Sequence, residues 1–117
     1  MMHNFRLNDE QLLLIENNIK DIELRLYDEK RKLISVNDDI VFEGIHSGKR
    51  ILTRCTALHR GKTFLELFNK FDSNIRFGSL PKETHEQMAD QMRKFYSEEQ
   101  ELKYGVIGIE VKYLRTL

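Results

Sequence analysis

Apolar and polar residues change their spacing several times along the chain, and each change predicts a new element. Leu12 and Ile15 lie at helical spacing within the first apolar stretch. Asn8 precedes this stretch and Gln11 stands three positions after Asn8, a spacing that resembles a capping box at a helix start. The pattern therefore predicts a helix over residues 9–18.

Strict alternation between apolar and charged residues follows the predicted helix. Ile22, Leu24 and Leu26 fall on one side of an extended chain, and Glu23 and Arg25 fall on the other side. This spacing predicts a half-buried strand, because only one of its two faces is apolar. The second face of that strand would carry a charged pair.

Strands and short helices are predicted in turn over the rest of the chain. Thr63, Thr84 and Ser97 are each followed three positions later by Glu or Gln, which indicates a helix start. We expect strands over residues 40–45, 50–59 and 107–113, helices over 64–71, 85–96 and 98–104, a hairpin loop over 46–49 and a long loop over 72–83. The long loop holds Pro81, the only proline, and we expect it to be functional or mobile.

Strands that are far apart in this order have to pair with one another. Such pairing favours a small mixed or barrel-like sheet flanked by helices, which is an α+β fold. The chain has 117 residues, of which 40% are hydrophobic and 32% are charged, a composition typical of one globular domain. We therefore expect a single domain over residues 1–117 with one compact core.

The cysteine content and the lengths of the apolar runs restrict the cellular compartments and the classes of protein to which this chain can belong. Cys55 is the only cysteine, so a disulfide framework and a multi-cysteine zinc site are excluded, and we interpret Cys55 as a buried, inert thiol. No apolar run is long enough to span a membrane or to act as a signal peptide. These features predict a cytoplasmic protein without a membrane partner.

Charge is balanced in total but not along the chain. Nineteen Lys and Arg residues match nineteen Asp and Glu residues, which disfavours a non-specific nucleic-acid-binding protein. Between Gly44 and Leu65 there is no acidic residue, whereas five basic residues lie there. This stretch favours a mildly positive face, which either binds an anionic ligand or only keeps the protein in solution.

Six stretches of the chain follow one another in an order and spacing that match a known family pattern. The first stretch is residues 15–26, Ile-Glu-Asn-Asn-Ile-Lys-Asp-Ile-Glu-Leu-Arg-Leu. The later stretches are residues 33–42, 58–60, 63–68, 96–100 and 104–110. Together these stretches resemble the ASCH family, a branch of the PUA-like superfamily, and in particular its small bacterial single-domain members. The family form of the first stretch is Ile-Lys-x-Gly-x-Lys-x-Ile-Glu-x-Arg, and the matches extend over about residues 15–114.

The resemblance implies both a fold and a function. It implies a PUA-like small β-barrel of about five to six mixed strands with helices packed around it. It also implies that the protein binds RNA or a modified nucleoside in a cleft beside the first barrel strand. Some family members resemble amidohydrolases that remove the acetyl group from acetylated cytidine, and others have been linked to RNA cleavage.

Three residues of the candidate site match positions of the family pattern. Lys20 matches the family lysine before the strand, and Glu23 and Arg25 match the Glu-x-Arg pair. In the amidohydrolase branch a nucleophilic threonine stands at the position of Glu23, next to the lysine that activates it. A carboxylate stands there in this chain, so the resemblance does not extend to the lysine–threonine pair of those enzymes.

The side-chain chemistry of the same three residues, taken without the family resemblance, also suggests a binding or catalytic site. A guanidinium binds a phosphate or a base edge through paired hydrogen bonds, and a carboxylate accepts from an exocyclic amine. A desolvated lysine transfers protons if its pKa falls. The alternative interpretation is a solvated strand face with a Glu–Arg pair that contributes less than about 1 kcal/mol.

His59, Arg60 and Tyr96 complete the set of candidate ligand-binding residues. His59 and Arg60 end a long predicted strand in the stretch without acidic residues, and Tyr96 ends a predicted helix, where an aromatic ring can stack on a base. The alternatives are a histidine bonded to the backbone and a tyrosine that covers the core edge. The four histidines show no pair at helical spacing, so we expect no metal site.

Two hypotheses about function follow. Neither of them requires a metal ion or a cofactor. The first is a binding module for RNA or a nucleoside that uses Lys20, Glu23 and Arg25. The second is a small hydrolase of an acylated nucleoside or of RNA, in which Lys20 transfers a proton and Glu23 activates water. A Glu23→Gln change would spare binding in the first case and abolish turnover in the second. A third possibility is a domain that works through protein contacts, which an exposed apolar patch would support.

Overall fold

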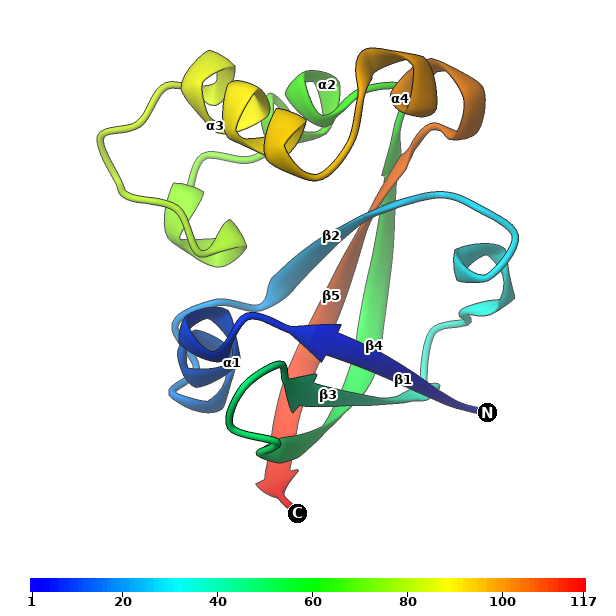
Figure 1. The fold of residues 1–117 in the computed structure, drawn as a ribbon, viewed down its shortest axis with the longest axis vertical. Coiled ribbons are helices and arrows are strands. Elements are labelled where there is room, and N and C mark those ends of the chain that lie inside the picture. The colour runs from blue at the N-terminus through cyan, green and yellow to red at the C-terminus, as the bar shows by residue number, and fades with distance from the viewer.

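Five strands form one mixed sheet in the order β1-β3-β4-β5-β2, and the sheet curls into a half-barrel that stays open between β1 and β2 (Figure 1). The computed structural model describes residues 1–117. The strands are β1 (Met2–Leu7), β2 (Ile22–Leu26), β3 (Asp39–Gly44), β4 (Arg50–Gly61) and β5 (Val106–Thr116). β1 is parallel to β3, and the other neighbours are antiparallel. The expected α+β class is confirmed, and the architecture is consistent with the PUA-like fold.

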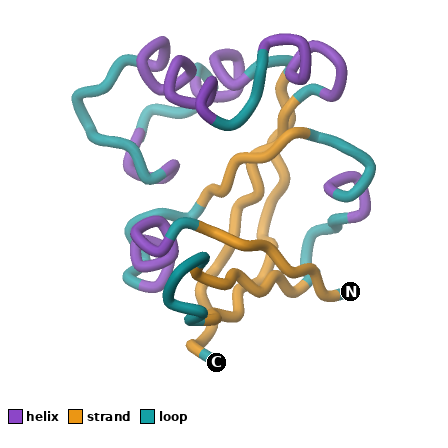
Figure 2. The backbone as a smooth tube through the Cα atoms, in the orientation of Figure 1, coloured by secondary structure: helices purple, strands orange, loops and turns teal.

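Helices lie at two ends of the sheet (Figure 2). One group packs together at the end where β5 begins, and α1 lies beside β1 and β3 near the other end (Figure 1). The α-helices are α1 (Asp9–Glu16), α2 (Phe64–Phe68), α3 (His85–Gln91) and α4 (Glu98–Tyr104), and the short 3-10 helices are η1 (Arg31–Leu33), η2 (Asn74–Phe77) and η3 (Met92–Lys94). The helix expected over residues 85–96 is therefore two elements, because the chain tightens into η3 after α3.

Helix starts follow the side chains predicted to cap them, but two of the four expected capping boxes are incomplete. Thr63 caps α2 alone, since its side chain accepts a hydrogen bond from the backbone N–H of Glu66 at 3.1 Å. Thr84 and Ser97 both form complete capping boxes. Asn8 caps α1 alone, since its side chain accepts a hydrogen bond from the backbone N–H of Glu10 at 2.9 Å. The side chain of Gln11 does not complete a box but accepts a hydrogen bond from Lys20. Gln11 is thus free to act at another place in the fold.

β1 is a strand that the sequence patterns did not predict. Its buried residues His3, Phe5 and Leu7 alternate with exposed ones, as expected for an edge strand with one face on the core. Asp38, just before β3, holds the start of β1 by accepting hydrogen bonds from the amino terminus at 3.3 Å and from His3 at 2.8 Å. The hydrogen bond from His3, with others, lowers the pKa of Asp38 to about 2.

Buried apolar residues form two clusters instead of the one core expected. The larger cluster fills the curl of the sheet around Phe42 and Ile109, and the other lies between the sheet and the helices around Ile22 and Phe68. β2 lies between them, with its three apolar side chains in the second cluster. Both faces of β2 are buried, so the prediction of a half-buried strand is wrong, although the second face does carry the charged pair. The alternative interpretation of a solvated strand face is wrong as well, because Glu23 on that face is only 5% exposed.

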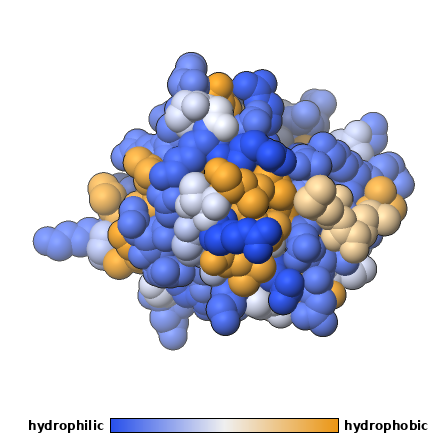
Figure 3. Space-filling view, turned by 90° about the horizontal axis from the view of Figure 1, so that it is seen from below, coloured by the Kyte–Doolittle hydropathy of each residue, from blue (hydrophilic) through white to orange (hydrophobic).

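Hydrophilic side chains cover most of the face seen from below (Figure 3). On the face seen from below, apolar side chains form groups that hydrophilic side chains cross or separate (Figure 3). This face therefore gives the protein-contact hypothesis no continuous apolar surface. No helix here combines the length and the apolar character that a membrane span requires.

One buried side chain organises the long loop over residues 72–83. The amide nitrogen of Asn74 donates to the backbone carbonyls of Leu80, Pro81 and Glu83 at 3.1, 3.3 and 2.7 Å. Asn74 is 8% exposed, so these carbonyls have a partner that water does not replace. The loop is thereby drawn around η2, which forms part of its length.

Replacing Asn74 tests this role. We expect Asn74→Ala to lower the free energy of unfolding by about 1–3 kcal/mol, because buried polar groups lose their partner. Urea unfolding followed by circular dichroism measures the change. Ser73→Ala is the matched control, since Ser73 makes no side-chain cap hydrogen bond, and it should change stability by less than about 0.5 kcal/mol. Equal stability of the two variants would contradict the assigned role.

Candidate functional site

A cavity of about 530 Å³ lies beside β2, where the half-barrel stays open. Its walls come from β1, α1, β2, the loop after η2, α3 and the segment that follows η3. A volume of this size is typical of sites for small molecules. The polar lining includes Gln11, Lys20, Glu23 and Arg25, and the apolar lining includes Leu24, Phe77, Met88, Met92, Phe95 and Tyr96.

Lys20 reaches the cavity because of the way α1 ends. Asn18 adopts a left-handed conformation with φ of 60°, and the backbone N–H of Lys20 donates to the carbonyl of Leu14 at 3.1 Å. This tight turn directs the lysine back toward its own helix. Its Nζ donates to Oε1 of Gln11 at 2.7 Å and lies 3.4 Å from Oε1 of Glu23. Lys20 is therefore 4% exposed, although it follows a surface turn.

Glu23 lies between two cations and uses only one of its oxygens. Its Oε1 accepts from the backbone N–H of Leu24 at 3.0 Å and lies 3.1 Å from Nη1 of Arg25. The same oxygen is the one that Lys20 approaches. The second oxygen, Oε2, is buried and has no hydrogen-bond partner. A buried acceptor without a partner is uncommon and calls for an explanation.

Arg25 joins the two open edges of the sheet. Its Nη1 donates to the carbonyl of Leu24 at 2.9 Å, and its Nη2 donates to the carbonyl of Arg6 in β1 at 3.1 Å. β1 and β2 form no ladder with each other, so this side chain takes the place of backbone pairing between them. The guanidinium also lies 5.4 Å from the centroid of the Phe5 ring, within the range of a cation–π interaction.

Burial and charge act in opposite directions on the pKa values in this cluster. Burial lowers the pKa of Lys20 below its ordinary value, and the attraction of Glu23 only partly offsets this. Burial alone would raise the pKa of Glu23, but Lys20 and Arg25 together outweigh it and lower that pKa. Glu23 is therefore a carboxylate at neutral pH, and Lys20 is the member of the cluster that loses its proton more easily than usual.

The loop after η2 presses against Lys20. Gly78 has φ of 81°, and a Cβ at this position would come within 3.0 Å of Cδ of Lys20 and would also meet the Gln11 side chain. Glycine is required here both for the left-handed backbone and for the space. The loop is held from outside by Arg76, whose guanidinium binds Asp21 at 3.0 Å. This wall of the cavity and the lysine are thus positioned together.

Two of the predicted binding residues do not line this cavity. His59 lies on the face of the sheet that carries Ile22, opposite to Glu23, and its Nε2 is 2.8 Å from Oε1 of Glu110. Arg60 is placed over the ring of Tyr27, 3.7 Å from its centroid. The prediction grouped these two residues with the site because they share a basic stretch. Successive residues of a strand point to opposite faces, which takes His59 away from Glu23 and Arg25. Arg60 shares their face, but β5 lies between its strand and β2.

Tyr96 does line the cavity, together with an aromatic residue that was not predicted. Tyr96 stacks on Phe64 with ring centroids 5.7 Å apart, so one of its roles is to cover the helical cluster. Phe95 lies beside it with 70% of its surface exposed. An exposed aromatic ring at the mouth of a cavity is available for stacking on a ligand.

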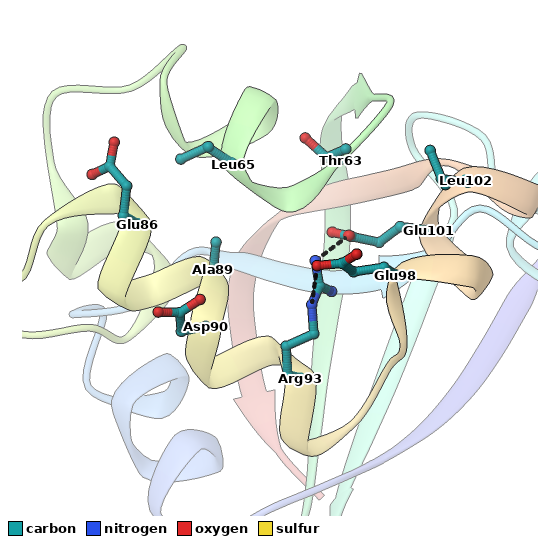
Figure 4. A pocket seen from close by; sticks show the side chains of 9 residues that line it. All are labelled: Thr63, Leu65, Glu86, Ala89, Asp90, Arg93, Glu98, Glu101 and Leu102. Carbon is teal, nitrogen blue, oxygen red and sulfur yellow. Dashed lines mark hydrogen bonds and ion pairs between the residues drawn. The ribbon is translucent and has the colours of Figure 1, made fainter.

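A second cavity of about 320 Å³ lies between α2, α3 and α4 (Figure 4). Arg93 points from the chain after α3 toward Glu98 and Glu101, and it binds Glu101 at 2.7 Å. Glu101 also accepts from the backbone N–H of Phe64 at 2.8 Å, so its role is to hold the start of α2. Four acidic residues against one arginine disfavour an anionic ligand here. No group of three His, Cys, Asp or Glu side chains anywhere is placed to hold a metal ion.

Gln11, Gly78 and Phe95 are among the residues of the main site that sequence reasoning missed, as are Met88 and Met92. Gln11 had been assigned to a capping box, and its contact with Lys20 depends on how the chain turns after α1. Gly78 lies in a segment that was predicted only as a loop. The one available signal was the adjacent pair Phe95 and Tyr96, because two aromatic residues in a row cannot both face the core of one helix.

Two solved structures are similar to this chain over almost its whole length. The crystal structure of the hypothetical protein PH0355 has 34% sequence identity and a TM-score of 0.84, with 97% of this chain and 100% of that chain covered. The solution NMR structure of protein PF0455 from Pyrococcus furiosus has 37% identity and a TM-score of 0.71, with 97% and 98% covered. Both likenesses therefore extend over the half-barrel and the helices alike.

A more distant likeness concerns the fold alone. The crystal structure of a mutant of ZmASCH from Zymomonas mobilis has 15% identity and a TM-score of 0.57, with 97% of this chain and 71% of that chain covered. Identity this low supports a shared architecture but not a shared chemistry. No model of a known protein family matches the chain, and no curated protein matches it either.

The charged cluster makes a prediction about stability and pH. We expect Glu23→Gln to lower the free energy of unfolding at pH 7 by about 3–5 kcal/mol, because Lys20 and Arg25 lose their buried counter-charge. The folded-state pKa of Glu23 is lowered, so its stabilisation is present above the ordinary glutamate pKa of about 4.3 and is lost as pH falls through the folded-state value. The difference between wild type and variant should therefore shrink at acid pH.

Urea unfolding at pH 7 and at pH 3 measures this difference. Glu29→Gln is the matched control, because Glu29 is a carboxylate in the connection after β2 and its ion pair with Lys32 is exposed. It should change stability by less than about 1 kcal/mol at either pH. A Glu23→Gln protein as stable as the Glu29→Gln protein at pH 7 would show that the buried cluster does not stabilise the fold.

Proposed function

We propose that this chain, which belongs to the same family as PH0355 and PF0455, binds RNA or a modified nucleoside in the cavity beside β2. The observation that carries the proposal is the buried carboxylate of Glu23, which lines the cavity and has one oxygen without a partner. A ligand that donates a hydrogen bond would supply the missing partner. Exocyclic base amines are donors of this kind.

We also infer that this family is a branch of the ASCH proteins. The stretch with the ASCH-like pattern forms the end of α1 and all of β2, which supply Lys20, Glu23 and Arg25 to the cavity. The half-barrel is also similar in architecture to ZmASCH. Both points support the inference independently, since one rests on sequence and the other on the path of the backbone.

The electrostatics of the cluster favour one kind of base. Glu23 is held as a carboxylate, which only accepts hydrogen bonds. Cytosine and adenine present an amine as a donor, whereas uracil and hypoxanthine present a carbonyl oxygen at the same place. A base carbonyl and the carboxylate of Glu23 are both hydrogen-bond acceptors, so neither can donate to the other. Placing them side by side weakens binding. The apolar side chains of Met88 and Met92 and the ring of Phe95 would then pack against the base.

A hydrolase remains the second candidate, and the lowered pKa of Lys20 is the observation that favours it. A buried lysine with a lowered pKa beside a carboxylate, in a cavity, is an arrangement typical of proton transfer. Glu23 is the weaker candidate for a general base, because its two cations lower its pKa and with it its basicity. Lys20 would accordingly take the proton from water, and Glu23 would orient the lysine.

The amine requirement is tested with matched pairs of ligands. We expect cytidine to bind at least about tenfold more tightly than uridine, and adenosine more tightly than inosine, since each pair differs in one amine. Isothermal titration calorimetry on the purified wild-type protein measures these affinities. Equal affinities within each pair, or no binding of any of the four, would contradict the proposed role of Glu23.

The stacking surface is tested with a variant that leaves the core intact. Phe95→Ala should weaken cytidine binding by about tenfold, because base–aromatic stacking contributes about 1–3 kcal/mol per base. Leu102→Ala is the matched control, because Leu102 is 78% exposed and lines the other cavity. If both variants bind cytidine as the wild type does, the ligand does not stack at the mouth of this cavity.

Incubation with acetylated cytidine separates the two candidate functions. A binding module returns the compound unchanged by liquid chromatography, whereas a hydrolase releases cytidine and acetate. Any such turnover should disappear in Lys20→Met, which keeps a long side chain but cannot transfer a proton. Turnover that survives this substitution would exclude Lys20 as the proton-transfer group.

A further inference from the structure

Three cations converge on one aromatic ring beside the cavity. Arg25, Lys30 and Arg31 place their charged groups 5.4, 5.9 and 5.2 Å from the centroid of the Phe5 ring. Arg25 is also part of the cavity wall, so the other two cations adjoin the site through a shared ring. Like charges this close repel one another unless anions lie between them.

The carboxylates nearby neutralise only part of this charge. Arg31 binds Asp28 at 3.0 Å, and Arg25 shares Glu23 with Lys20. The side chain of Lys30 is exposed and makes no hydrogen bond or ion pair, and Nε of Arg31 is buried without a partner. Four cations thus meet two carboxylates, an excess of two positive charges in a chain whose formal net charge is zero.

The positive surface continues beyond Phe5 along the same face of the sheet. Arg60 and Arg25 are both in register with Ile107 on β5, one from each side, so their side chains leave the sheet on the same face. Arg60 lies over the ring of Tyr27 at 3.7 Å and makes no ion pair. Lys30 near Phe5 and Arg60 over Tyr27 are therefore two cations without counter-charges.

We propose that Lys30 and Arg31, with Arg25 between them and the cavity, form a subsite for a phosphate group. The ligand of the cavity would then be a nucleoside that carries a phosphate, either as a free nucleotide or as one residue of an RNA chain. This inference rests on the proposed function, because it assigns the phosphate to the same ligand whose base enters the cavity. Neither Arg60 nor Tyr27 is needed for a single phosphate, but both would lie beside a second one.

Phosphate chemistry fits these groups well. Guanidinium and ammonium groups donate charge-assisted hydrogen bonds to phosphate oxygens, and the guanidinium offers several donors in one plane. Nε of Arg31 has no partner, and the bonds of Arg25 to Glu23, Leu24 and Arg6 all use its Nη atoms, so its Nε is also unused. A phosphate at this place would relieve the repulsion between the cations and would leave the ion pair of Arg31 with Asp28 unchanged.

The subsite is tested by adding a phosphate to one ligand. Calorimetric titration of the wild-type protein with cytidine, cytidine 5′-monophosphate and cytidine 3′-monophosphate gives three affinities. We expect one of the monophosphates to bind about tenfold more tightly than cytidine, as one or more charge-assisted hydrogen bonds would produce. Lys30→Gln should remove most of this gain, because it takes away an unpaired charge from an exposed side chain that makes no hydrogen bond or ion pair.

Lys112→Gln is the matched control, since Lys112 is an exposed lysine of β5 in register with Arg54 and outside the cavity wall. This variant should keep the full gain from the phosphate.

If cytidine binds and its monophosphates bind no more tightly, the subsite is overturned while the proposed function stands. If neither cytidine nor its monophosphates bind, both are overturned. A loss of the phosphate gain that is equal in Lys30→Gln and Lys112→Gln would also overturn the subsite, because it would reflect only the total charge.

The source of the phosphate is identified with a single-stranded oligocytidylate of seven nucleotides. If this RNA binds more tightly than the better monophosphate, with a steeper dependence on salt, the subsite belongs to an RNA-binding surface that continues toward Arg60. Equal affinity and an equal salt dependence would assign the subsite to a free nucleotide. Both results support a phosphate subsite.

Discussion

A carboxylate buried between two cations, at the open edge of a curled sheet, is the constraint on which this structure depends. The sheet does not close, because β1 and β2 form no ladder, and Arg25 bridges the two strands through the carbonyls of Leu24 and Arg6. Arg25 can lie there, mostly buried, only because Glu23 neutralises it, and Glu23 is in turn kept ionised by Lys20 and Arg25. One side-chain hydrogen bond, from Arg25 to the carbonyl of Arg6, thus links β1 and β2 where a closed barrel would have a backbone ladder.

The same opening creates the cavity. Where a closed barrel would continue its ladder, this chain leaves a space between α1, β2 and the helical layer, and side chains from all of them line it. The loop over residues 72–83 forms one wall, held inside by Asn74 and outside by Arg76. Gly78 lets this wall approach Lys20, so the position of the lysine depends on the loop as well as on α1.

Stability and binding therefore draw on the same residues in this protein. A fully satisfied cluster would stabilise the fold more, but Oε2 of Glu23 and Nε of Arg31 are buried without hydrogen-bond partners. Unsatisfied groups of this kind cost stability in the free protein and become favourable only when a complementary ligand binds. Glu23 lines the first cavity, whereas in the other cavity both oxygens of Glu101 have partners, the backbone N–H of Phe64 and the guanidinium of Arg93. This contrast is why the first cavity is the candidate site.

The sequence by itself determined the elements that short-range spacing controls. Alternation located β2 and placed Glu23 and Arg25 on one face, and capping residues located the starts of α1, α3 and α4. β1 was not predicted, because only Phe5 and Leu7 are apolar on its buried face, and two positions are too few to establish an alternation. Only the tertiary structure decided that the charged face of β2 is buried, that Gln11 and Gly78 meet Lys20, and that His59 lies on the other side of the sheet. The physical reason is that backbone geometry sets which side chains share a face, whereas burial depends on which distant segment packs against that face.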